Sequence, residues 1–267
     1  MTAFLLAHET TIRLTAFGLV LIGMACWELA SPRRKPTQSK AVRWANNLTL
    51  VAVNTLLLRF LFPVAAVGVA LNMDRENVGL FNWLKLPEPL AILFAVIILD
   101  FVIWAQHVIF HKVPILWRLH RMHHADLDYD VTTGARFHPI EIILSMGIKM
   151  AVVALIGAPA AAVILFEVLL NATALFNHAN IKLPQPVDRA LRYLIVTPDM
   201  HRVHHSWHWE ETDSNYGFNL SVWDRLFGTY RVEARDGQEG MTIGLESFRD
   251  PSNLRLDKLI TLPFRSS

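Results

Sequence analysis

The sequence has a single cysteine, Cys26, and few charged residues for its length of 267. One cysteine excludes an internal disulfide framework, a cysteine-based zinc site and a cysteine-ligated iron–sulfur cluster. Asp, Glu, Lys and Arg make up 18% of the chain, whereas soluble domains carry about 25%. The formal net charge of +2 is too small to indicate nucleic acid as a partner. The composition therefore favours an integral membrane protein over a large soluble domain.

Several cofactor motifs are also missing from the sequence. It contains no H-E-x-x-H motif of zinc proteases and no E-x-x-H pair of carboxylate-bridged di-iron bundles. It also lacks a glycine-rich dinucleotide fingerprint and any haem or flavin motif. If the chain carries out redox chemistry, its electrons must come from a separate protein.

Long apolar runs account for the mean hydropathy of +0.32. They cover residues 12–30, 48–71, 89–110 and 140–176. Pro63 should kink the second run, and the "GAP" at 157–159 should divide the last into a hairpin of two short helices. The first run lacks a preceding basic region and a clear cleavage site, so we interpret it as a retained span. The predicted fold is an all-α, multi-pass transmembrane bundle of three spans plus a helical hairpin, with a cytoplasmic helical cap carrying the histidine motifs.

The distribution of charge predicts the orientation of this bundle. The loop at 31–43 contains five Lys and Arg residues and no acid, so it should lie in the cytoplasm. The third run then returns inward, and ten of the twelve histidines, all between 107 and 205, reach the cytoplasmic face. We expect a bacterial inner membrane, or the endoplasmic reticulum membrane if the chain is eukaryotic.

Three histidine motifs carry the chemistry. Their spacing, i, i+4 in the first and i, i+3, i+4 in the others, places the imidazoles of each motif on one helical face. The motifs are His107 and His111, then His120, His123 and His124, then His201, His204 and His205. Eight imidazoles are too many for one metal ion but suit two. Imidazole binds zinc, copper, iron and nickel, and a structural zinc site would close with four ligands. Two irons at a membrane surface is the interpretation that uses all eight.

Three further residues are candidates for the site. His178 lies at the predicted exit of a span and is expected to be another ligand. His138 precedes a proline at a helix start, so it is a ligand, a partner of a ligand, or a helix-entry residue. Asp100 lies two turns before His107 and either holds a ligating imidazole in the right tautomer or is stabilised by Arg118 or Arg121.

The ordered motifs resemble the fatty acid hydroxylase/sterol desaturase superfamily. The segments "RFHPIE" (136–141), "NHAN" (177–180) and "NYGFNLSVWDRLFGTY" (215–230) are similar as well. The resemblance implies a catalytic domain at 89–230, an N-terminal membrane anchor at 1–88 and a cytoplasmic tail at 231–267. Some members carry an additional histidine where this chain has Ala174. The superfamily includes alkylglycerol monooxygenases and sterol-modifying enzymes.

The resemblance also implies an activity. It is that of a membrane-bound, non-haem di-iron oxygenase that uses O2 and external electrons to hydroxylate or desaturate a lipid, whether fatty acyl, sterol or ether lipid. The eight histidines of the three motifs, together with His178, would bind two irons, or zinc in the purified protein. No residue beyond the metal ligands is expected to be catalytic.

The expected partners are a lipid from the bilayer, O2 and a separate reductase, ferredoxin or cytochrome. A basic docking face for that donor is predicted at Lys112, Arg118, Arg121 and Arg202. Two alternatives stay open: a histidine-rich metal transporter and a zinc-bound, non-catalytic family member. The clustering of the histidines at one face counts against a transporter, because transporters place ion sites near the middle of the membrane.

Overall fold

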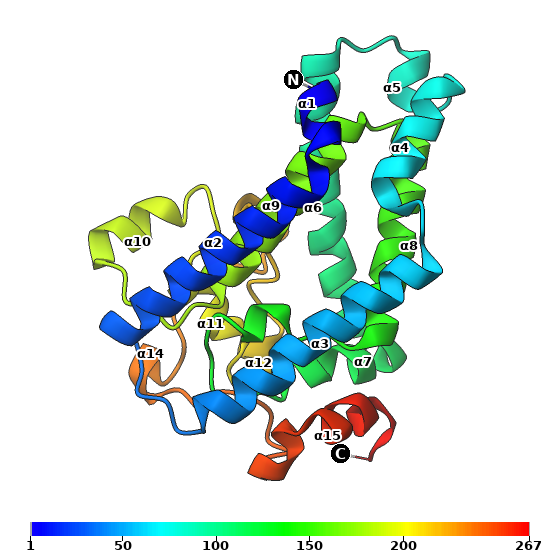
Figure 1. Ribbon diagram of the computed structural model, residues 1–267. Coiled ribbons are helices and arrows are strands. Elements are labelled where there is room, and N and C mark those ends of the chain that lie inside the picture. Colours follow the sequence, from blue (N-terminus) through cyan, green and yellow to red (C-terminus); the bar gives the residue numbers. More distant parts are fainter. Residues whose placement is uncertain (1, 267) are drawn as a thin grey trace.

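The computed structural model describes residues 2–266. In this range the regular elements are helices joined by loops, with isolated bridges but no β-strand (Figure 1). Five helical segments in it are long and apolar enough to cross a membrane. They are α2 (Glu9–Ala30), α3 (Lys40–Leu61) with its continuation to Trp83, α6 (Glu88–Lys112), α8 (Pro139–Ile156) and α9 (Ala160–Asn177). The chain is therefore an all-α integral membrane protein, as the composition predicts.

The remaining elements are short. Those before residue 140 are α1 (Thr2–Ala7), α4 (Ala65–Arg75), α5 (Leu80–Trp83), α7 (Pro114–His124) and η1 (Thr133–Ala135). Those after residue 180 are α10 (Gln185–Leu191), α11 (Pro198–His204), α12 (Trp209–Thr212), α13 (Val222–Leu226), α14 (Gly237–Gly240), η2 (Pro251–Leu254), α15 (Leu256–Thr261) and η3 (Leu262–Phe264).

The second apolar run differs from its prediction at both ends. Its helix α3 begins at Lys40, because the hydroxyl of Ser39 accepts a hydrogen bond from the Val42 amide at 3.5 Å and caps the first turn. At the other end the helix does not kink at Pro63 but stops at Leu61. The chain then turns, and α4 packs separately against α8 and α9.

Glycine allows the α8–α9 hairpin to turn tightly. Gly157 ends α8 in the left-handed conformation, with φ of 64°. A Cβ on Gly79 would lie 2.4 Å from the Gly157 Cα, so the two loops meet at a distance that only glycine permits. The predicted break at 157–159 is confirmed, because α8 stops at Ile156 and α9 starts at Ala160.

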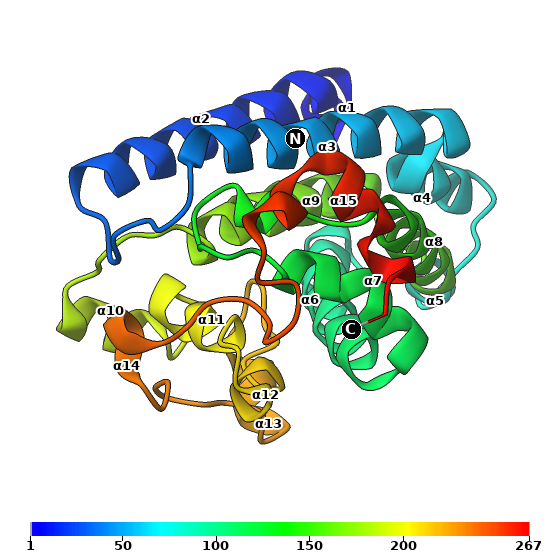
Figure 2. The same cartoon turned by 90° about the horizontal axis from the view of Figure 1, so that it is seen from below.

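The long helices converge on the short ones at one end of the molecule. Helix α2 packs along α9, α3 crosses α8, and α6 packs against both α8 and α9 (Figure 1). Viewed from below, α7 and α11–α13 gather at that end, and α15 lies over α7 and α3 (Figure 2). The upper part of the bundle has an apolar core formed by α4, α6, α8 and α9, whereas the buried side chains of the lower end are largely polar.

The two N-terminal long helices hold the loops around the histidines in place. Glu28 on α2 is buried, and its Oε1 accepts hydrogen bonds from the amides of Val131 at 2.6 Å and Asn180 at 2.7 Å. These two amides lie on loops that follow His124 and His178. The segment before residue 89 is therefore part of the scaffold of the histidine site as well as a set of membrane helices.

Candidate metal centre

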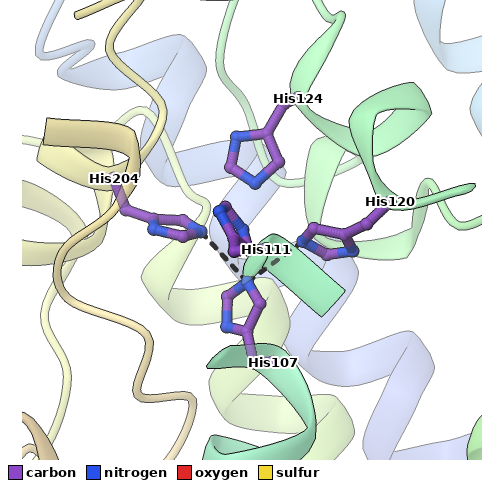
Figure 3. Close-up of side chains that lie close together, drawn as sticks. All are labelled: His107, His111, His120, His124 and His204. Carbon is purple, nitrogen blue, oxygen red and sulfur yellow. Dashed lines mark hydrogen bonds between the residues drawn. The ribbon is translucent and has the colours of Figure 1, made fainter. Parts of the chain in front are cut away.

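The described residues bring nine buried histidines into two groups. In each group, every histidine offers one ring nitrogen, and all these nitrogens lie within 4.8 Å of one another. The first group is His107, His111, His120, His124 and His204, and the second is His123, His178, His201 and His205. Figure 3 shows the five rings of the first group pointing toward a common centre from α6, α7 and α11.

Each H-x-x-H-H motif divides between the two groups. In α7, His120 and His124 are one turn apart and point into the first group, while His123 points into the second. The second motif does the reverse, because His201 and His205 enter the second group and His204 enters the first. The groups therefore touch: the rings of His124 and His205 stack with centroids 4.5 Å apart. Two motifs of this kind thus create two adjacent groups of imidazoles, each of which could hold a metal ion.

Hydrogen bonds at the outer ring nitrogens fix the tautomers in the first group. The Nδ1 of His107 lies 2.7 Å from the Tyr216 carbonyl, and that of His204 lies 2.7 Å from the Ser214 carbonyl. A carbonyl can only accept, so each Nδ1 carries the proton and each Nε2 presents a lone pair. The Nε2 of His107 nevertheless lies 3.0 Å from the Nε2 atoms of both His120 and His204 (Figure 3).

These facing lone pairs are the best structural evidence for a cation. Two nitrogens each ~2.1 Å from one metal ion lie about 3.0–3.4 Å apart at ligand angles between square and tetrahedral. Without a cation, the lone pairs would repel each other in a buried site. The Nε2 atoms of His111 and His124 point into the same space and have no hydrogen-bond partner among residues 2–266. The donor set fits a metal ion.

The second group has the same features. The Nε2 atoms of His123 and His178 are 3.2 Å apart, while their Nδ1 atoms donate to the carbonyls of Arg136 and Ala174. In His201 and His205, neither ring nitrogen has a partner within the described part of the chain. Ala174 thus contributes its backbone oxygen to hold His178.

Burial keeps these imidazoles in the form that binds metal. Desolvation is the main reason why the pKa of His123, His124, His201 and His205 lies well below the usual 6.5, and repulsion from neighbouring imidazoles lowers it further. Burial also lowers the pKa of His178 to about 3. The rings are therefore neutral at physiological pH, as metal ligation requires.

Two carboxylates orient histidines of the first group, and the sequence analysis did not single out either. Glu141 Oε1 accepts from His120 Nδ1 at 2.7 Å, and Asp213 Oδ1 accepts from His111 Nδ1 at 3.3 Å. Such a bond fixes the tautomer and raises the basicity of the ligating nitrogen. Glu141 lies within the "RFHPIE" segment, in which the sequence analysis named His138, three residues earlier, as the candidate.

Asp100 has a different role from either predicted one. It accepts hydrogen bonds from the indole of Trp223 at 2.8 Å and the amide of Leu220 at 3.3 Å. It therefore anchors the segment after Tyr216, whose carbonyl orients His107, and acts on the site through the backbone. The expectation that Asp100 contacts a ligand imidazole or an arginine was wrong, because the fold places the 215–224 segment against this side of α6.

His138 lies outside both groups of the described histidines. Its Nδ1 accepts from the amide of Ile140 at 3.2 Å, and its Nε2 lies 3.1 Å from the Ile260 carbonyl. It is the N-cap of α8 and links that helix to the C-terminal segment. The helix-entry interpretation is the correct one for this residue, and the ligand interpretation is wrong.

Only half of the predicted basic docking face is exposed: Lys112 and Arg118 lie at the surface, whereas the other two residues do not. Arg202 is fully buried and bonds to Asp199 and Gln238. Arg121 is buried as well, and its guanidinium donates to the carbonyls of Leu262 and Arg265. Both arginines fasten the polypeptide around the histidines, so neither is available to a partner protein.

A cavity of about 450 Å³ adjoins the first histidine group. His107, His120 and Glu141 form part of its wall at one end, and apolar side chains such as Phe17, Leu58, Met146 and Leu170 line the rest. The cavity lies among α2, α3, α6, α8 and α9. An apolar molecule in this space would reach the rings of the first group from the membrane side.

Comparisons with known proteins identify the family of the chain. A model of the fatty acid hydroxylase family matches residues 92–229, slightly more than half of the chain. The chain is 30% identical over 150 residues to an ornithine lipid hydroxylase of Rhizobium tropici, covering 56% of this chain and 44% of that protein. It is 27% identical over 192 residues to the human alkylglycerol monooxygenase, covering 70% of this chain and 40% of that protein.

A fatty acid hydroxylase of Lecanicillium sp is 24% identical over 249 residues, covering 83% of this chain and 63% of that protein. The chain thus spans less than half the length of the first two relatives. No solved structure matches significantly. The matched region contains all nine clustered histidines, and the chain belongs to the fatty acid hydroxylase family.

Proposed function

We propose that this chain is a membrane-bound di-iron oxygenase that hydroxylates a lipid with O2 and electrons from a separate protein. The observation that carries the proposal is the position of the first histidine group at the end of an apolar cavity inside a membrane bundle. The named relatives are hydroxylases and monooxygenases, which favours hydroxylation over desaturation. A fatty acyl, sterol or ether lipid fits the chemistry of the cavity.

The two histidine groups would hold one iron each. The bound iron pair would supply the activation of O2 that an unactivated C–H bond requires. The protein holds the ligands in place through their Nδ1 hydrogen bonds, so little reorganisation is needed during turnover. The nearly all-nitrogen ligand set differs from the carboxylate-rich set of soluble di-iron bundles. Zinc binds imidazole as well, so we expect it as a contaminant of the purified protein.

Aromatic side chains exclude water from the second group. The ring of Phe137 stacks on His123 at a centroid distance of 4.6 Å, and Tyr129 stacks on His178 at 5.5 Å. The hydroxyl of Tyr129 is also satisfied, since it donates to the Asn177 carbonyl at 2.6 Å. A dry site protects a reactive oxidant from side reactions with water.

The lipid would enter from the bilayer between α2 and α3. Both helices contribute to the cavity wall, α2 through Leu14 and Phe17, and α3 through Val51, Thr55 and Leu58. By the positive-inside rule, the loop that joins them lies in the cytoplasm, and so does the histidine end. We propose a bacterial inner membrane, with residues 89–230 as the catalytic domain, 1–88 as the membrane anchor and 231–267 as the cytoplasmic tail.

Oxygen consumption distinguishes this proposal from its alternatives. We expect the protein, loaded with iron in lipid nanodiscs and given a chemical or ferredoxin-type reductant, to consume O2 in step with a hydroxylated lipid detected by mass spectrometry. A zinc-bound, non-catalytic protein would consume none, and a transporter would instead carry metal across liposome membranes. Failure to couple O2 uptake to any product across fatty acyl, sterol and ether lipids would refute the proposal.

Replacing Glu141 with glutamine should impair the site without unfolding it. The amide keeps a hydrogen-bond acceptor for His120 Nδ1 but removes the negative charge that makes the imidazole a stronger ligand. We expect iron affinity or turnover to fall about 10–100-fold, measured by metal competition and by product formation. The exposed Glu246→Gln is the matched control and should behave like the wild type. Equal behaviour of the two variants would show that Glu141 does not tune the ligand.

A further inference from the structure

Three charged side chains from three helices meet on the wall of the cavity, remote from the histidines. They are Arg13 on α2, Lys149 on α8 and Glu167 on α9. The Nζ of Lys149 donates to Glu167 Oε1 at 2.5 Å, and the guanidinium of Arg13 pairs with Glu167 Oε2. The side chains of Lys149 and Glu167 are 12% and 4% exposed. The metal site does not use any of the three.

The cluster lies well inside the helical bundle. Lys149 is eight residues beyond Glu141 on α8, and Glu167 is eleven residues before His178 at the end of α9. At 1.5 Å per residue, these separations are about 12 and 16 Å along the helices. The charged cluster is therefore roughly 12–16 Å from the histidine end of the same cavity.

Holding a helix pair together does not require this set of charges. A charge near the middle of a span is costly to insert, and intramembrane charges usually serve a binding or transport function. Here one carboxylate, Glu167, faces two cations within the cavity wall. Arg13 has a second acid partner, Glu9, at 2.5 Å, but Glu9 lies outside the cavity lining. The two cations and two acids balance in charge, but only Glu167 of the two acids borders the cavity, so the lining itself presents more cations than acids here.

Other polar groups of the cavity lie close by. Gln106 donates to the Ser145 hydroxyl at 2.5 Å, and the amide of Asn171 donates to the Glu167 carbonyl at 2.7 Å. All four of these residues line the cavity. Arg59, exposed at the end of α3, adds a further cation to the lining. The rest of the wall is predominantly apolar, so the cavity has an apolar body with one polar, cationic region.

We propose that this cavity binds an amphiphile whose acidic group, a carboxylate or a phosphate, is held by Arg13 and Lys149. Its apolar chain then runs toward His107 and His120. The choice of reacting carbon rests on the function proposed above, because the distance from the acidic group to the histidines sets which carbon reaches the metal. Binding of the acidic amphiphile itself does not depend on turnover.

Equilibrium binding tests the proposal directly. The detergent-purified protein is titrated with palmitate, hexadecyl phosphate and hexadecanol in competition with radiolabelled palmitate. We expect at least one of the two acids to bind about tenfold or more tightly than the alcohol. The acid that binds more tightly identifies whether the cluster recognises a carboxylate or a phosphate. Equal affinity for all three amphiphiles in the wild-type protein would overturn the proposal without any variant.

Variants then locate the acid preference. Lys149→Gln should lose most of it while keeping the wild-type affinity for hexadecanol, and Lys149→Arg should retain it. Lys182→Gln removes an exposed lysine outside the cavity and is the matched control. If the ion pair of Lys149 were purely structural, Lys149→Gln would instead weaken the binding of all three amphiphiles alike and lower thermal stability. Preference for the acid that persists in both Lys149→Gln and Arg13→Gln would also overturn the assignment.

The binding measurement and the oxygenase assay fail separately. If the protein prefers acids but consumes no O2, the acid-binding site stands and the proposed function falls. If it turns over lipid without preferring acids, the proposed function stands and the acid-binding site falls. Where both succeed, Lys149→Gln should shift the position of the hydroxyl group along the chain, because the acidic group no longer fixes the register.

Discussion

Substitution of His205 with alanine is expected to abolish turnover and to remove about one metal ion per chain. Its group has four imidazoles, and the substitution leaves three, all held by a backbone built for four. His204→Ala, one residue earlier, takes a ligand from the other group and leaves four. We expect it also to abolish turnover, but with a smaller loss of metal. Each effect on turnover should exceed the ~10–100-fold cost of losing an outer hydrogen-bond partner.

The control for these variants lies in the same stretch of chain. His208 is three residues beyond His205 but bonds to Asp236 at 2.9 Å and belongs to neither group of the described histidines. His208→Ala should keep the full metal content and turnover. Metal analysis of the three variants beside product formation decides the matter. Retention of wild-type metal by His205→Ala, or equal damage in His208→Ala, would contradict the division of the motif between two sites.

Replacing Arg43 with methionine is expected to destabilise the fold by about 3–5 kcal/mol, because it leaves buried charges unpaired. Arg43 on α3 is 1% exposed, and its Nε and Nη2 each lie 2.8 Å from an oxygen of Asp126. Its Nη1 pairs with Asp130. These acids follow His124 directly, so their loss of a partner should loosen the end of α7. The apparent Tm should fall by about 10 °C or more.

Two comparisons make the Arg43 result specific. Arg75→Met removes an exposed arginine that, among residues 2–266, pairs only with Glu76 and Asn72 at its own helix end. It should change stability by less than about 0.5 kcal/mol. Arg43→Lys keeps the charge but loses the forked geometry, so it should fall between the two. An apparent Tm of Arg43→Met equal to that of Arg75→Met would show that the buried network does not stabilise the protein.

Much of the fold follows from local features of the sequence. The apolar runs give the long helices, and the Gly157 turn divides the last run where the pattern places it. The spacing of H-x-x-H-H brings three imidazoles onto one side of a helix, because residues one turn apart are neighbours. Pro63 marks a break correctly, although its position in a turn rather than a kinked helix depends on how α4 packs.

The division of each motif between two groups could not be predicted from spacing alone. Whether His123 joins His124 or His178 depends on how α7, α9 and α11 approach one another. For the same reason, the partners of the ligands were missed. Glu141 and Asp213 lie far from His120 and His111 in sequence, and only the packing of α8 and the segment after α12 brings them within hydrogen-bond distance.

Tertiary contacts also overrode the expectations for several charged residues. Asp100 was expected at a ligand imidazole or an arginine but holds Trp223, and Arg121 and Arg202 were expected at a surface but fasten buried loops. Charge patterns along a sequence indicate the side of the membrane, but they do not distinguish an exposed cation from one that is neutralised by a distant segment. The cluster of Arg13, Lys149 and Glu167 escaped notice because its members are remote in sequence.

Occupancy of the two groups of imidazoles by a pair of irons underlies the whole proposed function. It is tested most directly by metal analysis and Mössbauer spectroscopy of the protein purified anaerobically with iron supplied. We predict about two irons per chain with the spectrum of a coupled pair, absent from the His123→Ala, His204→Ala double variant. A single uncoupled iron, no bound metal, or full iron retention in the double variant would contradict it.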